Sequence, residues 1–399
     1  MEQRFIPFSP PDITQEEIDE VIDTLKSGWI TTGSKTKKFE EEIAKYVGTN
    51  RAVCLNSATA AMELTLRILG IGEGDEVITS AYTYTATAAV TDHVGAKIVM
   101  VDTKENSYEM DYEKLAEAIT ENTKVIIPVD LGGIICDYSK IFEVVERKKE
   151  LFSPNNEIQK QFNRIIVMAD SAHGFGSKQG DKNSGEIADF TTFSFHAVKN
   201  LTTSEGGAVT WRKDIGLDDD ALYKEFMLAS LHGQSKDALA KTQIGGWEYD
   251  ILYPAYKCNM TDIQSSLGLV QLKRYEDLLK RRREIVNIYD EAFNAIGLIT
   301  PEHFKNGNIS SCHLYLLRIP GIDAKRRSEI IIELAKKGIT TNVHYKPLPM
   351  MTAYKNLGFD INDYPNAYNQ YCNEITLPLH TGLSAEDVNY IIDGVKAVL

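Results

Sequence analysis

The sequence has few cysteines and no long apolar run. Its five cysteines are scattered along 399 residues and form no Cys-x-x-Cys pair. We therefore expect no metal site and no disulfide framework, and a reducing cytoplasmic environment fits this usage best. No window of about 18 uninterrupted apolar residues occurs, which argues against a membrane span. Residues 1–8 lack the apolar stretch of a signal peptide, so we expect no secretion signal.

Positive charge is also scarce. The chain has 43 lysines and arginines against 57 acidic residues, and its formal net charge is −14. Nonspecific nucleic-acid binding needs a basic face, so this class of protein is disfavoured. An anionic small ligand remains compatible with the charge, because helix dipoles and single lysines can override the global sign locally.

The apolar pattern divides the chain into three parts. Residues 1–13 form an extended arm with three prolines. Short apolar strands alternate with amphipathic helices over 14–260, which predicts a large domain whose mostly parallel sheet is covered on both faces. Residues 261–399 predict a smaller C-terminal α+β domain. The expected fold class is therefore α/β, with a three-layer α/β/α domain beside a smaller one.

Three segments give more specific expectations. Thr14 and Glu17 have capping-box spacing, which predicts a helix from Thr14 onward. Residues 261–295 predict one long helix or two joined helices. Residues 146–163 are long, charged and polar, so we expect an exposed insertion; a partner-binding loop is the alternative. The predicted apolar face of the first helix consists of Ile18, Val21, Ile22 and Leu25.

Lys199 occupies an unusual place for a charged residue. It follows a short β-like run at 190–195 and precedes the glycine pair 206–207. A lysine amine in such a place can form a Schiff base with pyridoxal 5'-phosphate (PLP), be displaced by a substrate amine and then act as a general base. A surface lysine in a loop is the alternative.

Asp170 and His173 follow the apolar strand 165–169. A carboxylate at this edge would be costly to bury unpaired. The pyridinium nitrogen of PLP would pair with it and remain protonated, which keeps the ring an electron sink. His173 could hydrogen-bond the phenolic oxygen of the same ring. The alternatives are a helix cap for Asp170 and a satisfied core histidine for His173.

Two further strand ends carry residues suited to a flat, phosphorylated cofactor. The small residues of 56–61 lie between a strand and a helix, where backbone N–H groups and the helix dipole favour an anion. The alternative is a simple helix cap by Ser57 or Thr59. The aromatic residues of 80–85 could stack on a ring, or pack in the core. Ser194 could add a hydroxyl to the phosphate cup.

These motifs, taken in order, resemble those of the DegT/DnrJ/EryC1/StrS family of sugar-nucleotide aminotransferases, which are fold-type I PLP enzymes. The most specific match is 194–200 followed by Glu205-Gly206-Gly207. The other matching segments are 28–33, 56–61, 72–78, 260–264 and 377–380.

The resemblance implies a role for each candidate site residue. Lys199 would bond to PLP, Asp170 would pair with the pyridine nitrogen, and His173 would lie near the phenolic oxygen. The family forms homodimers in which the partner subunit helps to close each site. The other implied cofactor contacts are Ala58, Thr59 and Ser194 to the phosphate, Tyr84 to the ring, and Lys257 from the partner. The expected substrate contacts are Trp29, Thr32, His344 and Tyr345.

The predicted function is a PLP-dependent aminotransferase that moves an amino group from L-glutamate to a nucleotide-linked keto sugar for surface glycan synthesis. The chain is most similar to the branch that aminates C4 of UDP-linked 4-keto sugars, of which the UDP-4-amino-4-deoxy-L-arabinose aminotransferase is the type. Two alternatives stay open: a PLP-dependent sugar dehydratase of the same family, which has histidine in place of Lys199, and a catalytically silent regulatory homologue. The chain departs from the family at Lys257, where asparagine is frequent, and at Asp130, where histidine is frequent.

Overall fold

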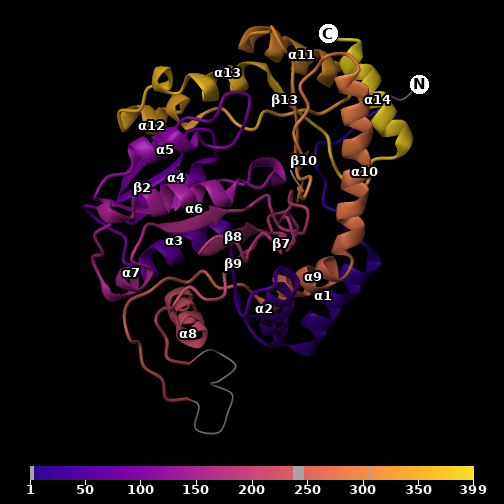
Figure 1. The fold of residues 1–399 in the computed structure, drawn as a ribbon. Coiled ribbons are helices and arrows are strands. Elements are labelled where there is room, and N and C mark those ends of the chain that lie inside the picture. Colours follow the sequence, from indigo (N-terminus) through magenta and orange to yellow (C-terminus); the bar gives the residue numbers. More distant parts are fainter. Residues whose placement is uncertain (1–3, 237–246, 306) are drawn as a thin grey trace.

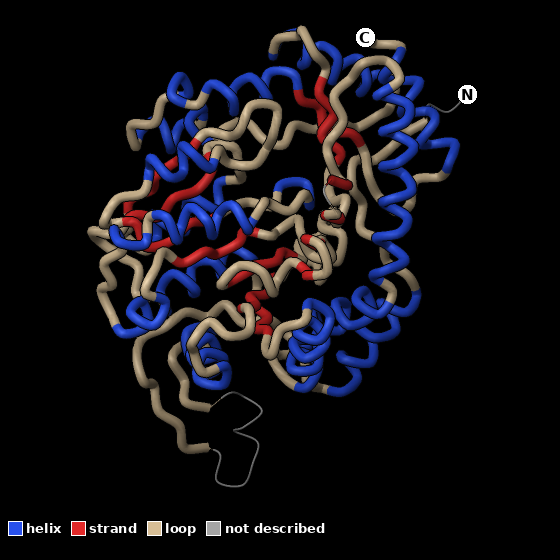
Figure 2. The backbone as a smooth tube through the Cα atoms, in the orientation of Figure 1, coloured by secondary structure: helices blue, strands red, loops and turns tan. Residues whose placement is uncertain are grey.

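The structure is a computed structural model, and it describes residues 4–236, 247–305 and 307–399. Helices lie on both sides of a central sheet, and a second group of helices surrounds a small two-stranded sheet (Figure 1). Figure 2 shows the strands of the central sheet enclosed between helices. This arrangement confirms the predicted α/β class.

The central sheet is mostly parallel, as predicted. Among the described residues seven strands follow the order β1-β9-β8-β5-β4-β2-β3. Strand β9 runs antiparallel to both of its neighbours, and the other pairs are parallel. The strands are β1 (Ala52–Leu55), β2 (Glu76–Ser80), β3 (Lys97–Val101), β4 (Thr123–Ile127), β5 (Ile166–Asp170), β8 (Phe190–Ser194) and β9 (Gly207–Trp211).

The helices that cover this sheet mostly connect its strands. They are α3 (Ala58–Ile68), α4 (Thr85–His93), α5 (Tyr112–Ala118), α6 (Tyr138–Arg147), α7 (Glu157–Phe162) and α8 (Asp219–Ser230). In open α/β sheets the carboxyl ends of the strands form the ligand-binding edge, so the loops that follow β1, β2, β5 and β8 meet there.

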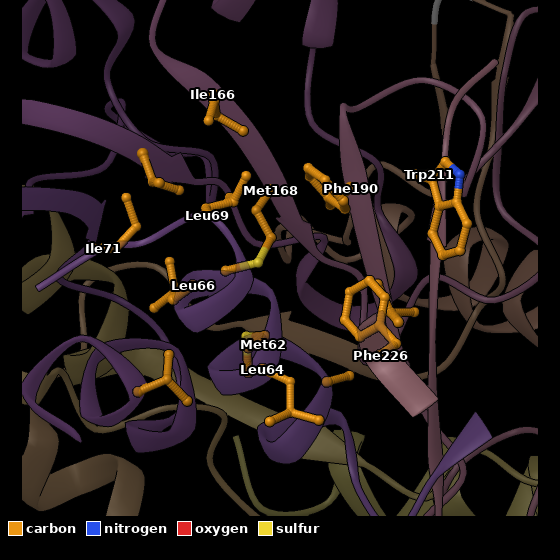
Figure 3. Packing of buried hydrophobic residues seen from close by; sticks show 14 of the residues in the cluster. Met62, Leu64, Leu66, Leu69, Ile71, Ile166, Met168, Phe190, Trp211 and Phe226 are labelled. Atoms are coloured by element: carbon orange, nitrogen blue, oxygen red, sulfur yellow. The ribbon is translucent and has the colours of Figure 1, made fainter. Parts of the chain in front are cut away.

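A buried apolar cluster fixes α3 against the sheet (Figure 3). Met62 and Leu66 of α3 are almost fully buried and belong to one cluster with Met168 of β5. Trp211 and Phe226 extend the cluster with stacked rings whose centroids lie 5.8 Å apart. This packing holds the N-terminal end of α3 at the carboxyl edge of the sheet.

The prediction of an exposed insertion at 146–163 is wrong for its second half. Helix α7 buries Gln159 completely and leaves Phe162 only 8% exposed. The side-chain amides of Asn156 and Gln159 both donate to the Leu69 carbonyl, each at 2.9 Å. These polar residues satisfy a carbonyl at the C-terminal end of α3, which helix geometry leaves without an intrahelical partner. These polar side chains therefore attach α7 to the end of α3, and their polarity is not a sign of exposure to solvent.

Helix α1 (Gln15–Ser27) begins with the predicted capping box between Thr14 and Glu17. Its apolar side nevertheless faces outward: Ile18 and Leu25 are 46% and 54% exposed. The side buried against the chain carries Glu17, whose carboxylate accepts from Arg274 at 2.7 Å. The predicted helix of 261–295 consists of two helices that meet at Arg274. They are α9 (Asp262–Lys273) and α10 (Tyr275–Asn294), and α9 packs against α1 and α2 (Ser34–Val47).

The C-terminal part has its own apolar cluster around the antiparallel pair β12 (Tyr315–Arg318) and β13 (Glu374–Leu377). Ile6 of the N-terminal arm joins this cluster and pairs with Ile339. The helices here are α11 (Ala324–Lys336), α12 (Thr352–Asn356), α13 (Pro365–Asn373) and α14 (Ala385–Lys396), and a small sheet joins β10 (Phe304–Lys305), β11 (Asn308–Ile309), β6 (Lys178–Gln179) and β7 (Lys182–Asn183). In the part of the chain that the structure describes, no helix combines the length and apolarity that crossing a membrane requires.

Candidate active site

A cavity of about 640 Å³ lies at the carboxyl edge of the central sheet. Its lining comes from three parts of the chain: the loops after the strands, the C-terminal part, and the N-terminal arm. Nine of the predicted site residues line it, namely Ala58, Thr59, Tyr84, Asp170, His173, Ser194, Lys199, His344 and Tyr345. The fold thus brings together residues that are up to 287 positions apart between Ala58 and Tyr345 (345 − 58).

One wall of the cavity is the N-terminal end of α3. Ser57 caps this helix, and its hydroxyl accepts the N–H of Ala60 at 3.1 Å. Gly207 lies directly beneath, because a Cβ there would come within 2.4 Å of the Ala58 nitrogen. Ser194, the register partner of Gly207 on β8, adds its hydroxyl to the same wall. Free N–H groups, the helix dipole and these hydroxyls suit a phosphate.

Asp170 forms another wall at the end of β5. Its side chain is almost fully buried and accepts two hydrogen bonds, from the Thr87 hydroxyl at 2.6 Å and from the Ala172 N–H at 3.2 Å. Burial raises the pKa of this carboxyl, and the nearby Lys199 opposes the rise. A buried carboxylate in this position is stabilised by a cationic N–H partner.

Lys199 lies in the turn that follows β8. Burial lowers the pKa of its amine to about 8, and the charge of Asp170 opposes this shift. An amine with this pKa is partly neutral near pH 7, and the neutral form is the nucleophile. The backbone of the turn is held by the Lys199 N–H, which donates to the His196 carbonyl at 2.9 Å.

His173 is held in one tautomer. Its Nδ1 accepts the backbone N–H of Gly132 at 3.1 Å, so the proton of the neutral ring is on Nε2. Burial, with smaller contributions from Lys199 and His344, lowers its pKa well below the usual value, and the ring is therefore neutral. Nε2 lies 3.3 Å from the Tyr345 hydroxyl and lines the cavity as a donor.

The structure adds His313 and Asn200, which sequence reasoning missed. The two side chains share a hydrogen bond of 2.9 Å, and the Asn200 amide also donates to the Ser311 carbonyl at 2.7 Å. The His313 ring lies 4.4 Å from that of His173, and it lines the cavity. The only sequence signal was the position of Asn200 next to Lys199.

The N-terminal arm also reaches the cavity. Phe8 stacks on His344 with ring centroids 5.6 Å apart and an angle of 18° between the rings. The Ser9 hydroxyl donates to the Val198 carbonyl at 3.2 Å, next to Lys199. No spacing in the sequence pointed to these contacts.

Three predicted residues lie outside this cavity. Trp29 donates its indole N–H to the Thr32 carbonyl at 3.2 Å, and Thr32 is buried with its hydroxyl on the Met260 carbonyl. Lys257 is exposed, and its amine contacts the side-chain oxygen of Asn259. Within one chain these residues do not complete the site.

Both carboxyl oxygens of Asp130 accept hydrogen bonds from other groups of the protein. Its Oδ1 accepts from the Cys136 N–H and from the Tyr138 hydroxyl, both at 3.0 Å, and its Oδ2 accepts from the Ser171 hydroxyl at 2.6 Å. Burial raises its pKa to about 6. The carboxyl group thus ties the loop after β4 to the loop after β5.

The chain matches known proteins over its whole length. Spr1654 of Streptococcus pneumoniae, described as a sugar aminotransferase, has been solved in PMP and PLP forms; the PMP form is 59% identical, with a TM-score of 0.96 and 98% of each chain covered. The spore coat polysaccharide biosynthesis protein SpsC of Bacillus subtilis is 40% identical over 99% of this chain and 97% of its own.

A third relative carries a more specific name. The UDP-4-amino-4-deoxy-L-arabinose–oxoglutarate aminotransferase of Shewanella sediminis is 32% identical over 100% of this chain and 99% of its own. The model of the DegT/DnrJ/EryC1/StrS aminotransferase family matches residues 11–396. This match and the similarity to Spr1654, which has been solved with PLP, show that the chain belongs to the DegT/DnrJ/EryC1/StrS family and is a PLP-dependent sugar aminotransferase.

Proposed function

We propose that the enzyme transfers the amino group of L-glutamate to C4 of a UDP-linked 4-keto sugar, for surface glycan synthesis. The name of the Shewanella relative pairs a UDP-4-amino sugar with oxoglutarate, the keto acid that glutamate leaves behind. The name of SpsC refers to polysaccharide biosynthesis. These relatives, at 32% and 40% identity, support the proposal.

The cavity residues fit PLP. The phosphate would be held by Ala58, Thr59 and Ser194, and the pyridine nitrogen by Asp170, whose burial calls for a cationic partner. Tyr84 would lie against the ring. When bound, PLP supplies the carbonyl that accepts the amino group and the electron sink that stabilises charge on the substrate carbon.

The side chains of the protein would bind the substrate and transfer the protons. Lys199 has an amine with the lowered pKa that a nucleophile and proton carrier needs, and it would move the proton at the reacting carbon. His173 would donate from Nε2 to the phenolic oxygen of the cofactor, since Gly132 occupies its other nitrogen. His344 and Tyr345 would face the sugar substrate.

We also propose that the enzyme is a cytoplasmic homodimer in which the partner subunit brings Lys257, Trp29 and Thr32 to the site. All three lie outside the cavity of their own chain. The segment before Lys257 exposes large apolar side chains, which a second copy would cover. These are Trp247, Tyr249, Ile251, Leu252 and Tyr256. Each subunit would consist of the arm 1–13, a domain 14–260 and a domain 261–399, with one apolar cluster around β5 and another around β12.

The observation that carries the proposal is the lowered pKa of Lys199 in a cavity that also holds Asp170 and the end of α3. L-glutamate alone should convert the bound cofactor to its amine form, seen as a change in absorbance. Lys199→Ala should abolish this change, and Lys213→Ala, in a surface turn, should not. A panel of keto-sugar nucleotides, with the amino position fixed by NMR, then identifies the acceptor. If glutamate leaves the absorbance unchanged, the proposed function is wrong.

A further inference from the structure

A buried hydrogen-bond ring joins Glu374 to the wall of the cavity. Glu374 begins β13 and has no exposed surface. Its Oε1 accepts from the Thr376 hydroxyl at 2.5 Å, and its Oε2 accepts the backbone N–H of His344 at 3.0 Å. The Thr376 oxygen in turn lies 2.9 Å from Nδ1 of His344. Of these three residues, His344 is the one that lines the cavity.

The number of protons in this ring determines the tautomer of His344. An ionised carboxylate only accepts, so the Thr376 hydroxyl donates to Glu374 and must accept a proton from Nδ1. A protonated Glu374 donates to Thr376 instead, since its Oε2 is taken by the His344 N–H. The hydroxyl then donates to Nδ1, and the ring proton is on Nε2.

We propose that Glu374 is a positioning residue that acts through Thr376 and determines whether Nε2 of His344 presents a donor or an acceptor to the bound substrate. Nδ1 is committed to Thr376, so Nε2 is the nitrogen left for a ligand. A donor suits the oxygens of a sugar nucleotide, whose diphosphate and keto groups only accept. The inference thus rests on the proposed function for the identity of the ligand.

Only a neutral imidazole has two tautomers, so this role requires His344 to be uncharged. Burial, with a smaller contribution from Lys199, lowers the pKa of His344 to about 4. Phe8 stacks on one face of the ring and Tyr345 meets it edge-on at 4.9 Å between centroids. These contacts hold the ring in place, so a change in the ring can only be a change of tautomer.

The surroundings of Glu374 shift the pKa of its carboxyl in opposite directions. Arg318 faces it across the β12–β13 pair, and Arg327 of α11 donates to the Glu374 backbone carbonyl at 3.2 Å. Both cations favour the carboxylate, but burial outweighs them and raises the pKa of Glu374 to about 8. The carboxyl is therefore protonated at pH 7 and loses its proton as the pH rises through that value. The neighbouring phenols, Tyr82, Tyr108 and Tyr345, are neutral in this range because their pKa values are raised.

Two substitutions separate this role from simple packing. In Glu374→Gln the amide oxygen would accept the His344 N–H, and the amide NH₂ would donate to Thr376. This copies the protonated state, so Nε2 of His344 should carry the proton at every pH. In Thr376→Val the shape is kept but the hydroxyl is lost, which should disconnect His344 from Glu374.

The test is NMR of the PLP-loaded enzyme labelled with ¹⁵N-histidine. Two-bond ¹H–¹⁵N correlations distinguish protonated from bare ring nitrogens, and His344→Gln assigns the signal. Between about pH 5.5 and pH 9.5, wild-type His344 should change from the Nε2–H to the Nδ1–H form. Glu374→Gln should stay in the Nε2–H form, and Thr376→Val should show no transition.

A wild-type ring that keeps one tautomer over this range would overturn the inference, as would a Glu374→Gln variant that titrates like the wild type. The wild-type titration decides even where a variant does not fold. In kinetics, the wild-type KM for the sugar nucleotide should rise about tenfold toward pH 9.5, the loss expected for one hydrogen bond to the ligand, while Glu374→Gln stays level. Because the NMR needs no sugar, a wrong acceptor leaves its result intact.

Discussion

At the residue scale, the site contains two groups, Asp170 and Lys199, whose charged forms are destabilised by burial. Asp170 and Lys199 both lose hydration on burial, which raises the pKa of the first and lowers that of the second. Each also favours the charged form of the other. The balance leaves an amine that gives up its proton near neutral pH and a carboxylate that a cationic ring nitrogen would satisfy.

The first prediction concerns the pH dependence of cofactor capture. Below about pH 8 the Lys199 amine is protonated, so the rate of covalent PLP binding to the apoenzyme should fall about tenfold per pH unit. Above that pH the rate should level off, because the amine is already neutral. Stopped-flow absorbance of mixed apoenzyme and PLP measures this. A rate that still climbs tenfold per unit between pH 9 and pH 10 would show that the pKa of Lys199 is not lowered.

At the element scale, the ends of strands and helices place the site. Helix α3 packs on the sheet through Met62 and Leu66, and this packing positions its N-terminal N–H groups beside β9. The close approach depends on Gly207, which starts β9 and leaves no space for a Cβ. The wall of the cavity at the N-terminal end of α3 thus depends on helix packing as much as on the residues that line it.

The second prediction is that Gly207→Ala weakens PLP binding. The new Cβ would clash at 2.4 Å with the backbone of Ser57 and Ala58, which can move only with α3. Overpacking of this kind costs about 1–3 kcal/mol, so the Kd for PLP should rise about tenfold and the melting temperature should fall. Gly72→Ala is the matched control, since its Cβ would find the nearest atom at 3.7 Å. Equal PLP affinities in both variants would contradict this account.

At the scale of the whole molecule, apolar surface remains uncovered. Among the described residues, exposed apolar side chains gather on the outward side of α1, with Ile18, Ile22 and Leu25, and on the segment with Trp247, Ile251 and Leu252. Polar and apolar residues have exchanged their usual places on α1, since Glu17 and Thr24 are the buried ones. Surfaces of this kind mark protein–protein contacts.

The third prediction tests the proposed dimer. Replacing Ile251 and Leu252 together with lysine should place two charges in an apolar interface, and burial of such side chains is worth about 1.5–3 kcal/mol each. The dimer Kd should rise at least about 100-fold, and light scattering should give the mass of one chain. Activity should fall with the dimer. Ile332→Lys on α11, at a side chain 55% exposed, is the control and should leave the mass unchanged. An unaltered dimer in the double variant would place the interface elsewhere.

Much of the fold and nine of the residues that line the cavity could be predicted because the signals are local. Capping boxes such as Thr14–Glu17 depend on residues three positions apart, and strand–helix alternation depends on short apolar periods. Asp170 ends β5, the turn before α3 follows β1 directly, and Lys199 lies in the turn after β8. The docking of α7 could not be read in this way, since Gln159 is polar and its partner, Leu69, lies 90 positions away.

The sequence by itself determined the fold class, the order of the elements and the choice of candidate site residues, because each of these depends on near neighbours in the chain. Only the tertiary structure decided which distant side chains surround them. Phe8 stacks on His344, His313 pairs with Asn200, and Glu374 reaches His344 through Thr376, whereas Trp29 and Lys257 lie apart from the cavity. Such contacts follow from how helices and sheets pack, and packing leaves no fixed spacing in a single sequence.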